Sequence, residues 1–406
     1  MAAAKDQVTL EIGGREVLVT HPGKLLIAEA KVSKLDLVNY YVAVAEGALR
    51  GAGGRPCVLV RYPNGIAEEF FFQKRAPASR PGWMEVAEIR FPSGRSAEEV
   101  VPRHAADLAW MANLACLELH PHPVRAGDLE HPDELRVDLD PVPGVEWPQI
   151  VQVAGVVQEV LSDLGLAAWP KTSGSRGIHV LVRIRPHWSF DEVRRAALAL
   201  AREVERRAPR LATSKWWKEE RHGVFVDYNQ NAKDRTVASA YSVRPKPDAR
   251  VSAPVRWEEL ALCEPGDFTL HTMPARFRAV GDPHAAIDDA PCSLEPLLAL
   301  SDTQGQGDAP WPPHYRKAAG EPRRAPPSTA PRAKKPLIEV ARTEREAEAV
   351  AAAEAWKASH PKAAAHLAPA DVLVDRMRGR SSLWYRVRIN LEHVPARLRP
   401  KEGKPG

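Results

Sequence analysis

Apolar and polar positions follow two different periods along the first 300 residues. Alternation with a period of two, typical of strands, runs through 8–20 on either side of Gly13-Gly14 and predicts a β-hairpin. A period near 3.6 predicts amphipathic helices, such as 150–164 and, after the capping box Ser189 to Glu192, 189–207. The same criteria predict helices at 34–49 and 105–120, strands at 57–62, 69–72, 136–140, 179–182 and 224–227, and two short helical pieces between 253 and 300.

The pattern changes beyond residue 300. Gln304-Gly305-Gln306-Gly307 and the stretch from Pro310 to Pro336, rich in Pro, Ala, Arg and Lys, have the composition of a linker, which we place at 301–336. The last segment, 337–406, is predicted to contain an Ala/Glu-rich helix near 343–358 and a strand at 383–391. That strand would either add an edge strand or bind nucleic acid, and the role of this basic segment is left open.

Composition is that of an ordinary globular protein. The 406 residues, 44% hydrophobic and 27% charged, suffice for one large or two medium domains. The net charge of +5 fits a polyanionic partner without requiring one. Four scattered cysteines without a CxxC motif are expected to be reduced residues of a cytosolic protein. Because the sequence shows no signal core and no stretch of membrane-spanning length, we expect a cytoplasmic protein.

Two carboxylates stand close together in the predicted strand Arg136–Pro141. Strand periodicity places Asp138 and Asp140 on one face, with Val137 and Leu139 on the other. Like charges so close repel unless a cation lies between them, and oxygen ligands suit magnesium or manganese. A surface strand that ends in acids is the alternative interpretation, because Asp-x-Asp alone is a weak signal.

A loop rich in glycine and serine follows, from Lys171 to the strand that begins at His179. Gly174 and Gly177, among small hydroxyl residues, allow several backbone N–H groups to converge on a phosphate, with Lys171 and Arg176 supplying charge. A simple turn between strands is the alternative, but the nearby Asp-x-Asp favours the phosphate interpretation.

The segment Val224–Asn231 is a second short apolar strand that delivers a carboxylate at its end, Asp227. Three acids from two strands make a two-metal site plausible, in which both ions bridge the phosphates of a substrate.

Three consecutive phenylalanines, Phe70 to Phe72, cannot all face the core of a one-sided sheet. Phe71 or a neighbour is therefore either exposed beside Arg61, Lys74 and Arg75, where it could stack on a base, or part of a strand buried on both faces.

Taken together, these motifs match a known family. Val-Asp-Leu-Asp-Pro, Thr-Ser-Gly-Ser-Arg-Gly-Ile-His and Val-Phe-Val-Asp-Tyr-Asn-Gln-Asn occur in this order, followed by the run from Arg235 to Arg244. As a set they resemble the archaeo-eukaryotic primase superfamily, most closely the polymerase module of bacterial ATP-dependent DNA ligase D, over about residues 8–300. The resemblance implies an α+β primase-polymerase fold with central antiparallel or mixed β-sheets flanked by helices. The sequence contains no ligase-type Lys-x-Asp-Gly motif and no nuclease module, so a stand-alone polymerase is expected.

The resemblance also implies an activity. It is that of a template-dependent nucleotidyl transferase that extends primers and fills gaps or broken DNA ends with ribo- or deoxynucleotides, in repair such as non-homologous end joining. The implied partners are primer–template DNA, gapped or broken DNA with a 5′-phosphate, NTP or dNTP, and a separate DNA ligase and end-binding protein, with no membrane involved. The implied location is the bacterial cytoplasm, in association with the nucleoid.

Site residues follow position by position from the same resemblance. The two divalent ions, manganese or magnesium, would be held by Asp138, Asp140 and Asp227. The nucleotide would contact His120 near its sugar, and Ser173, Arg176, His179, Gln230 and Arg244 at its phosphates. DNA would contact Arg61, the aromatic pair Phe71 and Phe72 on the template, and Lys24 and Lys34 at a 5′-phosphate. Taken without the resemblance, the lysines read as a solvated face and His120 as the end of a helix.

Two positions depart from the family pattern. Val60 precedes Arg61 where a lysine is common, and His21 stands where the 5′-phosphate pocket has an asparagine. Both departures concern the recognition of DNA ends more than the chemistry.

Two other functions use parts of the same pattern. Sugar transferases that act on nucleotide-sugars combine Asp-x-Asp with manganese, but they need no third acid after a Gly-rich loop. A non-catalytic module of the same fold could bind DNA ends through Lys24 and Lys34, although the presence of all three acids argues against lost catalysis.

Overall fold

The computed structural model describes residues 6–91, 94–312, 315, 337–343, 345–368, 371–378 and 383–400. The chain divides into two compact units, Met1–Arg323 and Arg324–Gly406, and each is described by itself below. The proposed boundaries at 300 and 336 remain predictions, and most of the predicted linker lies outside the described residues.

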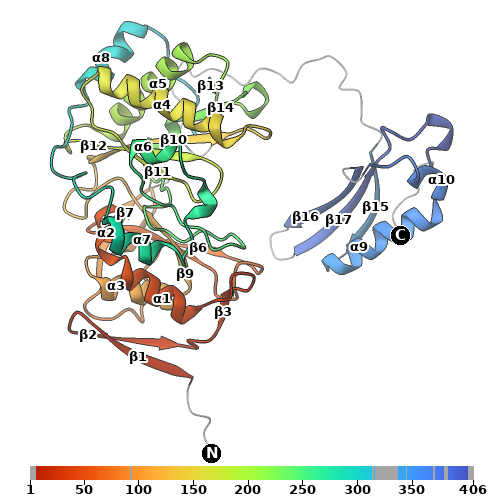
Figure 1. Cartoon of the computed structure of the whole chain (residues 1–406), viewed down its shortest axis with the longest axis horizontal. Helices are drawn as coiled ribbons and strands as arrows, with labels where there is room; N and C mark the ends of the chain where they lie inside the picture. Colours follow the sequence, from red (N-terminus) through yellow and green to blue (C-terminus); the bar gives the residue numbers. More distant parts are fainter. Residues whose placement is uncertain are drawn as a thin grey trace, which may run out of the picture. The chain divides into compact units, whose positions relative to one another are not determined.

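The first unit is built around two five-stranded sheets (Figure 1). One has the order β11-β12-β10-β14-β13, and only the pair β13 and β14 is parallel. Its strands are β10 (Glu134–Pro141), β11 (Trp169–Thr172), β12 (Ile178–Arg183), β13 (Ala212–Thr213) and β14 (Val224–Asp227).

The second sheet has the order β6-β5-β8-β7, with β9 also paired to β5. Its strands are β5 (Cys57–Arg61), β6 (Phe71–Gln73), β7 (Glu85–Arg90), β8 (Ser96–Val101) and β9 (Cys116–Pro121), and every pairing is antiparallel. Two smaller antiparallel pairs precede it, formed by β1 (Gln7–Ile12) with β2 (Arg15–Thr20), and by β3 (Leu25–Ile27) with β4 (Val32–Ser33). The predicted hairpin at 8–20 is confirmed.

Helices gather at the two ends of this unit, as Figure 1 shows. At one end lie α4 (Trp147–Asp163), α5 (Phe190–Arg207) and α8 (Glu295–Gln304), and at the other α1 (Lys34–Ala43), α2 (Ala45–Ala52) and α3 (Ala105–Asn113). The short helices are α6 (Trp257–Leu260), α7 (Met273–Val280), and the 3-10 turns η1 (Lys218–Glu220), η2 (Tyr228–Asn231) and η3 (Pro265–Asp267). Ser189 caps α5 through the predicted capping box.

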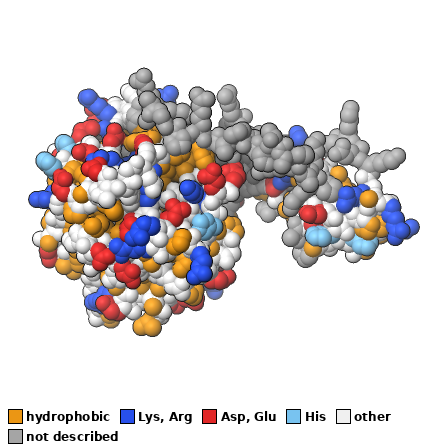
Figure 2. Space-filling model, turned by 90° about the horizontal axis from the view of Figure 1, so that it is seen from above, with side chains coloured by type: hydrophobic (Ala, Val, Ile, Leu, Met, Phe, Trp, Pro, Cys, Tyr) orange, Lys and Arg blue, Asp and Glu red, His pale blue; other side chains and the backbone are white. Residues whose placement is uncertain are grey.

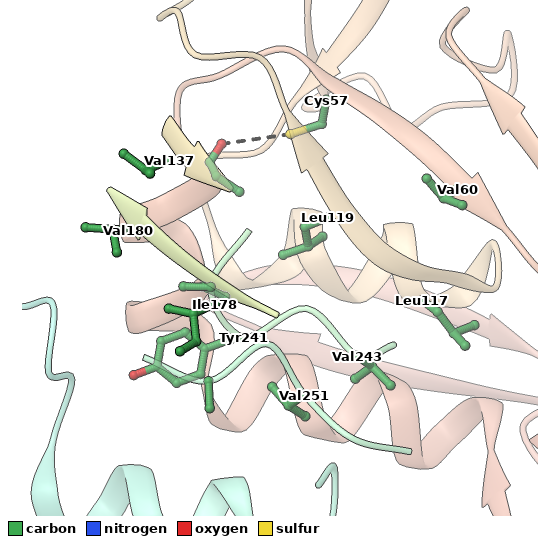
Figure 3. Close-up of a cluster of buried hydrophobic side chains, with 14 of the residues drawn as sticks. Cys57, Val60, Leu117, Leu119, Val137, Ile178, Val180, Tyr241, Val243 and Val251 are labelled. Atoms are coloured by element: carbon green, nitrogen blue, oxygen red, sulfur yellow. Dashed lines mark hydrogen bonds between the residues drawn. The ribbon is translucent and has the colours of Figure 1, made fainter. Parts of the chain in front are cut away.

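A continuous apolar core joins the two sheets. Figure 3 shows part of it, where Leu119 of the second sheet lies between Val137 and Val180 of the first sheet and Val60 and Leu117 of the second. Alternation along β10 puts Leu135, Val137 and Leu139 into this core, so the intervening acidic side chains point the other way. Apolar burial therefore fixes the direction in which the site residues project.

Two predicted helices were wrong in extent. The expected helix at 34–49 is two helices that meet at Val44. The expected helix at 105–120 ends at Asn113, because Ala115 takes a left-handed φ of 57° and β9 begins at the next residue. His120 therefore lies on a strand opposite Val58, not at the end of a helix.

Part of the stretch with linker composition is packed. α8 continues to Gln304, and the side chain of Arg194 on α5 donates hydrogen bonds to Asp308, Ala309 and Pro310. Hydrogen-bond partners on a neighbouring helix hold this Gly- and Pro-rich stretch, and composition does not reveal them.

The second unit is a three-stranded antiparallel sheet with a helix packed on it. Its elements are β15 (Leu337–Thr343), α9 (Glu346–Ser359), α10 (Pro361–Ala364), β16 (Val372–Arg378), β17 (Leu383–Asn390) and the 3-10 turn η5 (Ala396–Leu398). The strand order is β15-β17-β16, so the strand considered as an added edge is the central one. Tyr385, Val387 and Ile389 are buried, as the predicted alternation requires.

Within the described ranges, the helices lack the combination of length and apolar character that crossing a membrane requires.

Gly177 lies where the loop after β11 comes very close to β10, and a substitution there tests this packing. A Cβ at this position would lie 2.1 Å from the carbonyl oxygen of Leu139 on β10. We expect Gly177→Ala to lower the free energy of unfolding by about 2–4 kcal/mol, because the loop and β10 must separate. The matched control is Gly155→Ala in α4, which meets no atom within 4 Å and should raise it by about 0.5–1 kcal/mol. Urea denaturation measures both, and an unaffected Gly177→Ala would contradict the packing.

Candidate active site

The register of β10 gathers the predicted acids. Asp138 is paired with His179 on β12 and with Asp227 on β14, so it lies between them. Asp140 follows two residues later, opposite Phe225, and its side chain is exposed. Asp138 therefore lies beside Asp227 on the adjacent strand and two residues from Asp140 on its own strand, and their role as a set of metal ligands stays a prediction.

The pKa values show the cost of this convergence. Burial, and then the charges of Asp227 and Asp140, raise the pKa of Asp138 to about 7. Burial also raises the pKa of Asp227 above its usual value. A raised pKa means that the protein does not compensate the negative charge of the ionised carboxyl group, and this is the electrostatic condition under which a bound cation stabilises that form.

Gln230 lies between two of these acids. Its Nε2 donates to Oδ2 of Asp138 at 3.3 Å and to Oδ2 of Asp227 at 3.1 Å. The backbone N–H of Asn229 donates to the other oxygen of Asp227 at 2.9 Å. The turn after β14 thus controls the orientation of Asp227.

The donor set fits a divalent cation in kind. Carboxylate oxygens are the ligands that magnesium and manganese prefer. Across the described ranges, however, no three His, Cys, Asp or Glu side chains form a ready-made metal cage. The acids are neighbours on two paired strands, and repulsion between their charges opposes a closer approach.

His179 is buried behind Asp138, with its Nε2 at 3.4 Å from Oδ1 of Asp138. Its Nδ1 shares a 2.8 Å hydrogen bond with Nζ of Lys171, which also donates to the carbonyl of Ala238 and the hydroxyl of Ser252. Burial and the charge of Lys171 lower the pKa of His179, so the imidazole is neutral. The expectation that Lys171 supplies charge to the loop is wrong, because this fully buried lysine instead holds His179.

The predicted phosphate loop is closed by Ser173, whose hydroxyl accepts from the N–H groups of Ser175 and Gly177. Arg244 lies against it, since a Cβ at Gly174 would meet Cγ of Arg244 at 2.5 Å. Arg176 is exposed and donates to the carbonyl of Pro141 at the end of β10. The loop, Arg244 and β10 are therefore neighbours.

The sequence analysis missed a buried acid that joins Arg244 to the second sheet. Glu118 on β9 pairs with Nε of Arg244 at 3.1 Å and lies 3.7 Å from Nε2 of His120. The hydroxyl of Tyr62 also donates to it. Although burial opposes this, contacts with His120 and Arg244 lower the pKa of Glu118. The alternation Leu117-Glu118-Leu119-His120 was a strand signal that the helix prediction concealed.

Exposed aromatic residues lie beside His120. Phe70, Phe71 and Phe72 are 39%, 43% and 59% exposed, so the interpretation as a strand buried on both faces is wrong. The ring of Phe72 is edge-on to His120 at 6.3 Å between centroids, and the guanidinium of Arg61 lies over Phe71. These rings offer π-faces close to the second sheet.

Lys24, Lys34 and Arg61 form a second cationic group. Lys34 is only 7% exposed, and its Nζ donates to the hydroxyl of Thr20 at 3.4 Å. Burial, and then the charges of Lys24 and Arg61, lower the pKa of Lys34. Lys24 donates to Asn64, and Arg61 donates to the carbonyl of Leu114 and the side chain of Gln73. Because these hydrogen-bond partners are neutral, the positive charges of the neighbouring side chains are not compensated, and the group favours binding of an anion.

Comparison with known proteins assigns the chain to a family. The model of the LigD primase-polymerase domain matches residues 33–284. The chain belongs to the LigD primase-polymerase family. This confirms the predicted family and its α+β fold.

Relatives of this LigD-type domain are parts of longer proteins. The "Multifunctional non-homologous end joining protein LigD" of Mycolicibacterium smegmatis is 34% identical over 279 residues, 68% of this chain and 36% of the relative. The protein of the same name from Pseudomonas aeruginosa is 33% identical over 64% of this chain and 31% of its own length. The chain thus spans about a third of these proteins. Among solved structures, the polymerase domain of Mycobacterium tuberculosis ligase D, in complex with DNA, matches with a TM-score of 0.64 and 32% identity, over 68% of this chain and 99% of that one.

The raised pKa of Asp138 makes the stability of this domain depend on pH. Because the folded protein holds a proton that the unfolded chain loses near pH 3.8, stability falls as the pH rises from about 4 to 7. Asp138→Asn cannot ionise at this position. At pH 8 we therefore expect its free energy of unfolding to exceed that of the wild type by on the order of 2 kcal/mol, with little difference at pH 4. Manganese at pH 8 should stabilise the wild type more than the variant. Urea denaturation across this range measures the difference, and parallel pH profiles would contradict the account.

Proposed function

We propose that this chain is a template-dependent nucleotidyl transferase that extends primers and fills gaps or broken DNA ends. The observation that carries the proposal is the placement of Asp138, Asp140 and Asp227 on the paired strands β10 and β14, next to His179 on β12. Family membership supports the reaction class.

The three aspartates would hold two divalent ions, manganese or magnesium, which when bound neutralise charge on the reacting phosphates and lower the pKa of the attacking hydroxyl. The protein's own part is to bring these carboxylates together at the end of an apolar strand. Gln230 donates a hydrogen bond to the carboxylate of Asp138 and another to that of Asp227. The exposed Asp140 would leave the C-terminal end of β10 accessible to a primer terminus.

Donors beside the acids would hold the triphosphate. The exposed Arg176 and the adjacent Arg244 would offer guanidinium groups to phosphate oxygens, and Ser173, whose hydroxyl closes the loop, would lie beside them. Neutral His179, held by Lys171, would donate a hydrogen bond without adding charge beside Asp138. His120, with Nδ1 3.4 Å from the hydroxyl of Thr236, would lie near the sugar.

DNA would be bound at two places on the second sheet and its neighbours. The exposed rings of Phe71 and Phe72 would stack on the template. Lys24, Lys34 and Arg61 would hold the 5′-phosphate of a gap or broken end. Acidic and basic side chains are interspersed on the face of the first unit in Figure 2, so local clusters and not net charge carry this assignment. The relative solved in complex with DNA supports it.

The names of the relatives support a role in non-homologous end joining. A ligase and an end-binding protein would then act on the same DNA, in the bacterial cytoplasm and at the nucleoid. Family membership removes the support for a nucleotide-sugar transferase.

A primer-extension assay tests the activity. Labelled primer–template, ribo- and deoxynucleotides and manganese should give template-directed extension. Asp227→Ala should reduce the extension rate at least about 1000-fold, because a carboxylate that supports both ions is lost, while DNA binding and folding persist. Unreduced extension in Asp227→Ala would contradict the proposal. A folded wild type that binds DNA ends but never extends a primer would instead support the non-catalytic module.

Recognition of the 5′-phosphate has its own test. Lys34→Met should weaken binding of gapped DNA that carries a 5′-phosphate about tenfold and leave unphosphorylated DNA unaffected, because a charge-assisted contact is lost. The matched control is Lys31→Met, which removes an exposed lysine just before β4. Fluorescence anisotropy measures both affinities. Equal losses with and without the phosphate would contradict the assignment.

A further inference from the structure

The turn that follows Asp227 is held from outside the site by a buried arginine. Nε of Arg194, on α5, donates to Oδ1 of Asn229 at 2.7 Å. The backbone N–H of Asn229 donates in turn to Oδ1 of Asp227 at 2.9 Å. One residue, Asn229, therefore connects the guanidinium to the carboxylate.

The same arginine also holds the chain beyond α8. Its Nη1 donates to Asp308 at 2.7 Å, and its Nη2 donates to the carbonyls of Ala309 and Pro310 at 2.7 and 3.1 Å. The ring of Trp311 covers the guanidinium at 3.9 Å, and its indole N–H donates to Asp308. We call Asp308–Trp311 the strap.

The strap and the turn are also joined directly. Nδ2 of Asn229 donates to the carbonyl of Pro310 at 3.0 Å, and the hydroxyl of Tyr228 donates to the same oxygen at 3.4 Å. Asn229, buried to 2% exposure, is thus bonded through both its side-chain oxygen and nitrogen. Its position is set by Arg194 and the strap together.

The hydrogen bonds of Arg194 matter for the position of the turn because the guanidinium is buried. A buried guanidinium is tolerated only when its donors are satisfied, and Arg194 finds one carboxylate and three neutral oxygens. Its removal would leave the side-chain oxygen of the buried Asn229 and the carbonyl of Ala309 without this donor, while the carbonyl of Pro310 keeps Asn229 and Tyr228. The turn would then move, and Asp227 and Gln230 with it.

We propose that Arg194 and the strap are positioning elements for the carboxylate site, which fix the Tyr228–Asn231 turn and so the direction of Asp227. The inference rests on the proposed function, because it concerns the cation that Asp227 would bind. It also means that the working polymerase unit extends through Trp311, beyond the end at residue 300 that composition predicts.

Manganese binding by the full-length chain tests the proposal without an activity assay. Free manganese, followed by electron paramagnetic resonance, gives the dissociation constant. We expect Arg194→Gln to weaken binding about tenfold, as loss of an outer partner of a metal ligand typically does. The matched control is Arg195→Gln, since Arg195 is the next residue of α5 and pairs with Asp302 of α8 on the surface at 3.0 Å. It should change the constant less than about twofold.

A second variant keeps the arginine and alters the strap. Asp308→Ala removes the partner of both Arg194 and Trp311, and should weaken manganese binding about threefold while the fold persists. If both variants lower the Tm but bind manganese as the wild type does, the strap is only structural and the proposal is overturned. If the wild type itself binds no manganese, the proposed metal site fails, and the positioning role fails with it. Wild-type binding that only Arg194→Gln and Asp308→Ala weaken supports both.

Discussion

The site depends on the repulsion between carboxylates that strand pairing forces together. β10 is anchored by Leu135, Val137 and Leu139 in the apolar core, so its acidic side chains have no freedom to face elsewhere. Pairing with β14 then sets Asp227 opposite Asp138. The free energy of core burial, which is large, holds in place an arrangement of charge that is locally unfavourable.

The surroundings of the acids moderate this repulsion without removing it. Gln230 donates to two of the carboxylates, Asn229 to one, and neutral His179 lies behind Asp138. Arg244, whose charge acts on Asp138, is paired with Glu118 of β9. Burial nevertheless keeps the pKa values of Asp138 and Asp227 above their usual range.

Much of this arrangement could be predicted from the sequence, because alternation along a strand decides which side chains share a face. That rule placed Asp138 and Asp140 on one face of their strand. Helical periodicity failed at Ala115, whose left-handed backbone ends a helix that the pattern alone would continue. Glu118, which follows in β9, was missed for that reason.

The sequence did not reveal contacts between residues that lie far apart in the chain. Lys171 resembles a loop cation until the fold buries it against His179, and the chain after residue 300 resembles a linker until Arg194 is seen to hold it. Neither partner leaves a local signal, because each pairing joins residues that only the tertiary fold makes neighbours. The alternation that marks a strand likewise did not tell whether Phe71 was covered.

A crystal structure of the chain with manganese, a nucleotide and a primer–template would test the central claim most directly. The account predicts that Asp138 and Asp227 both ligate manganese, that Asp140 joins them, and that the amide of Gln230 has left its position between the two paired acids. Manganese bound elsewhere, with Gln230 still bridging Asp138 and Asp227, would contradict it.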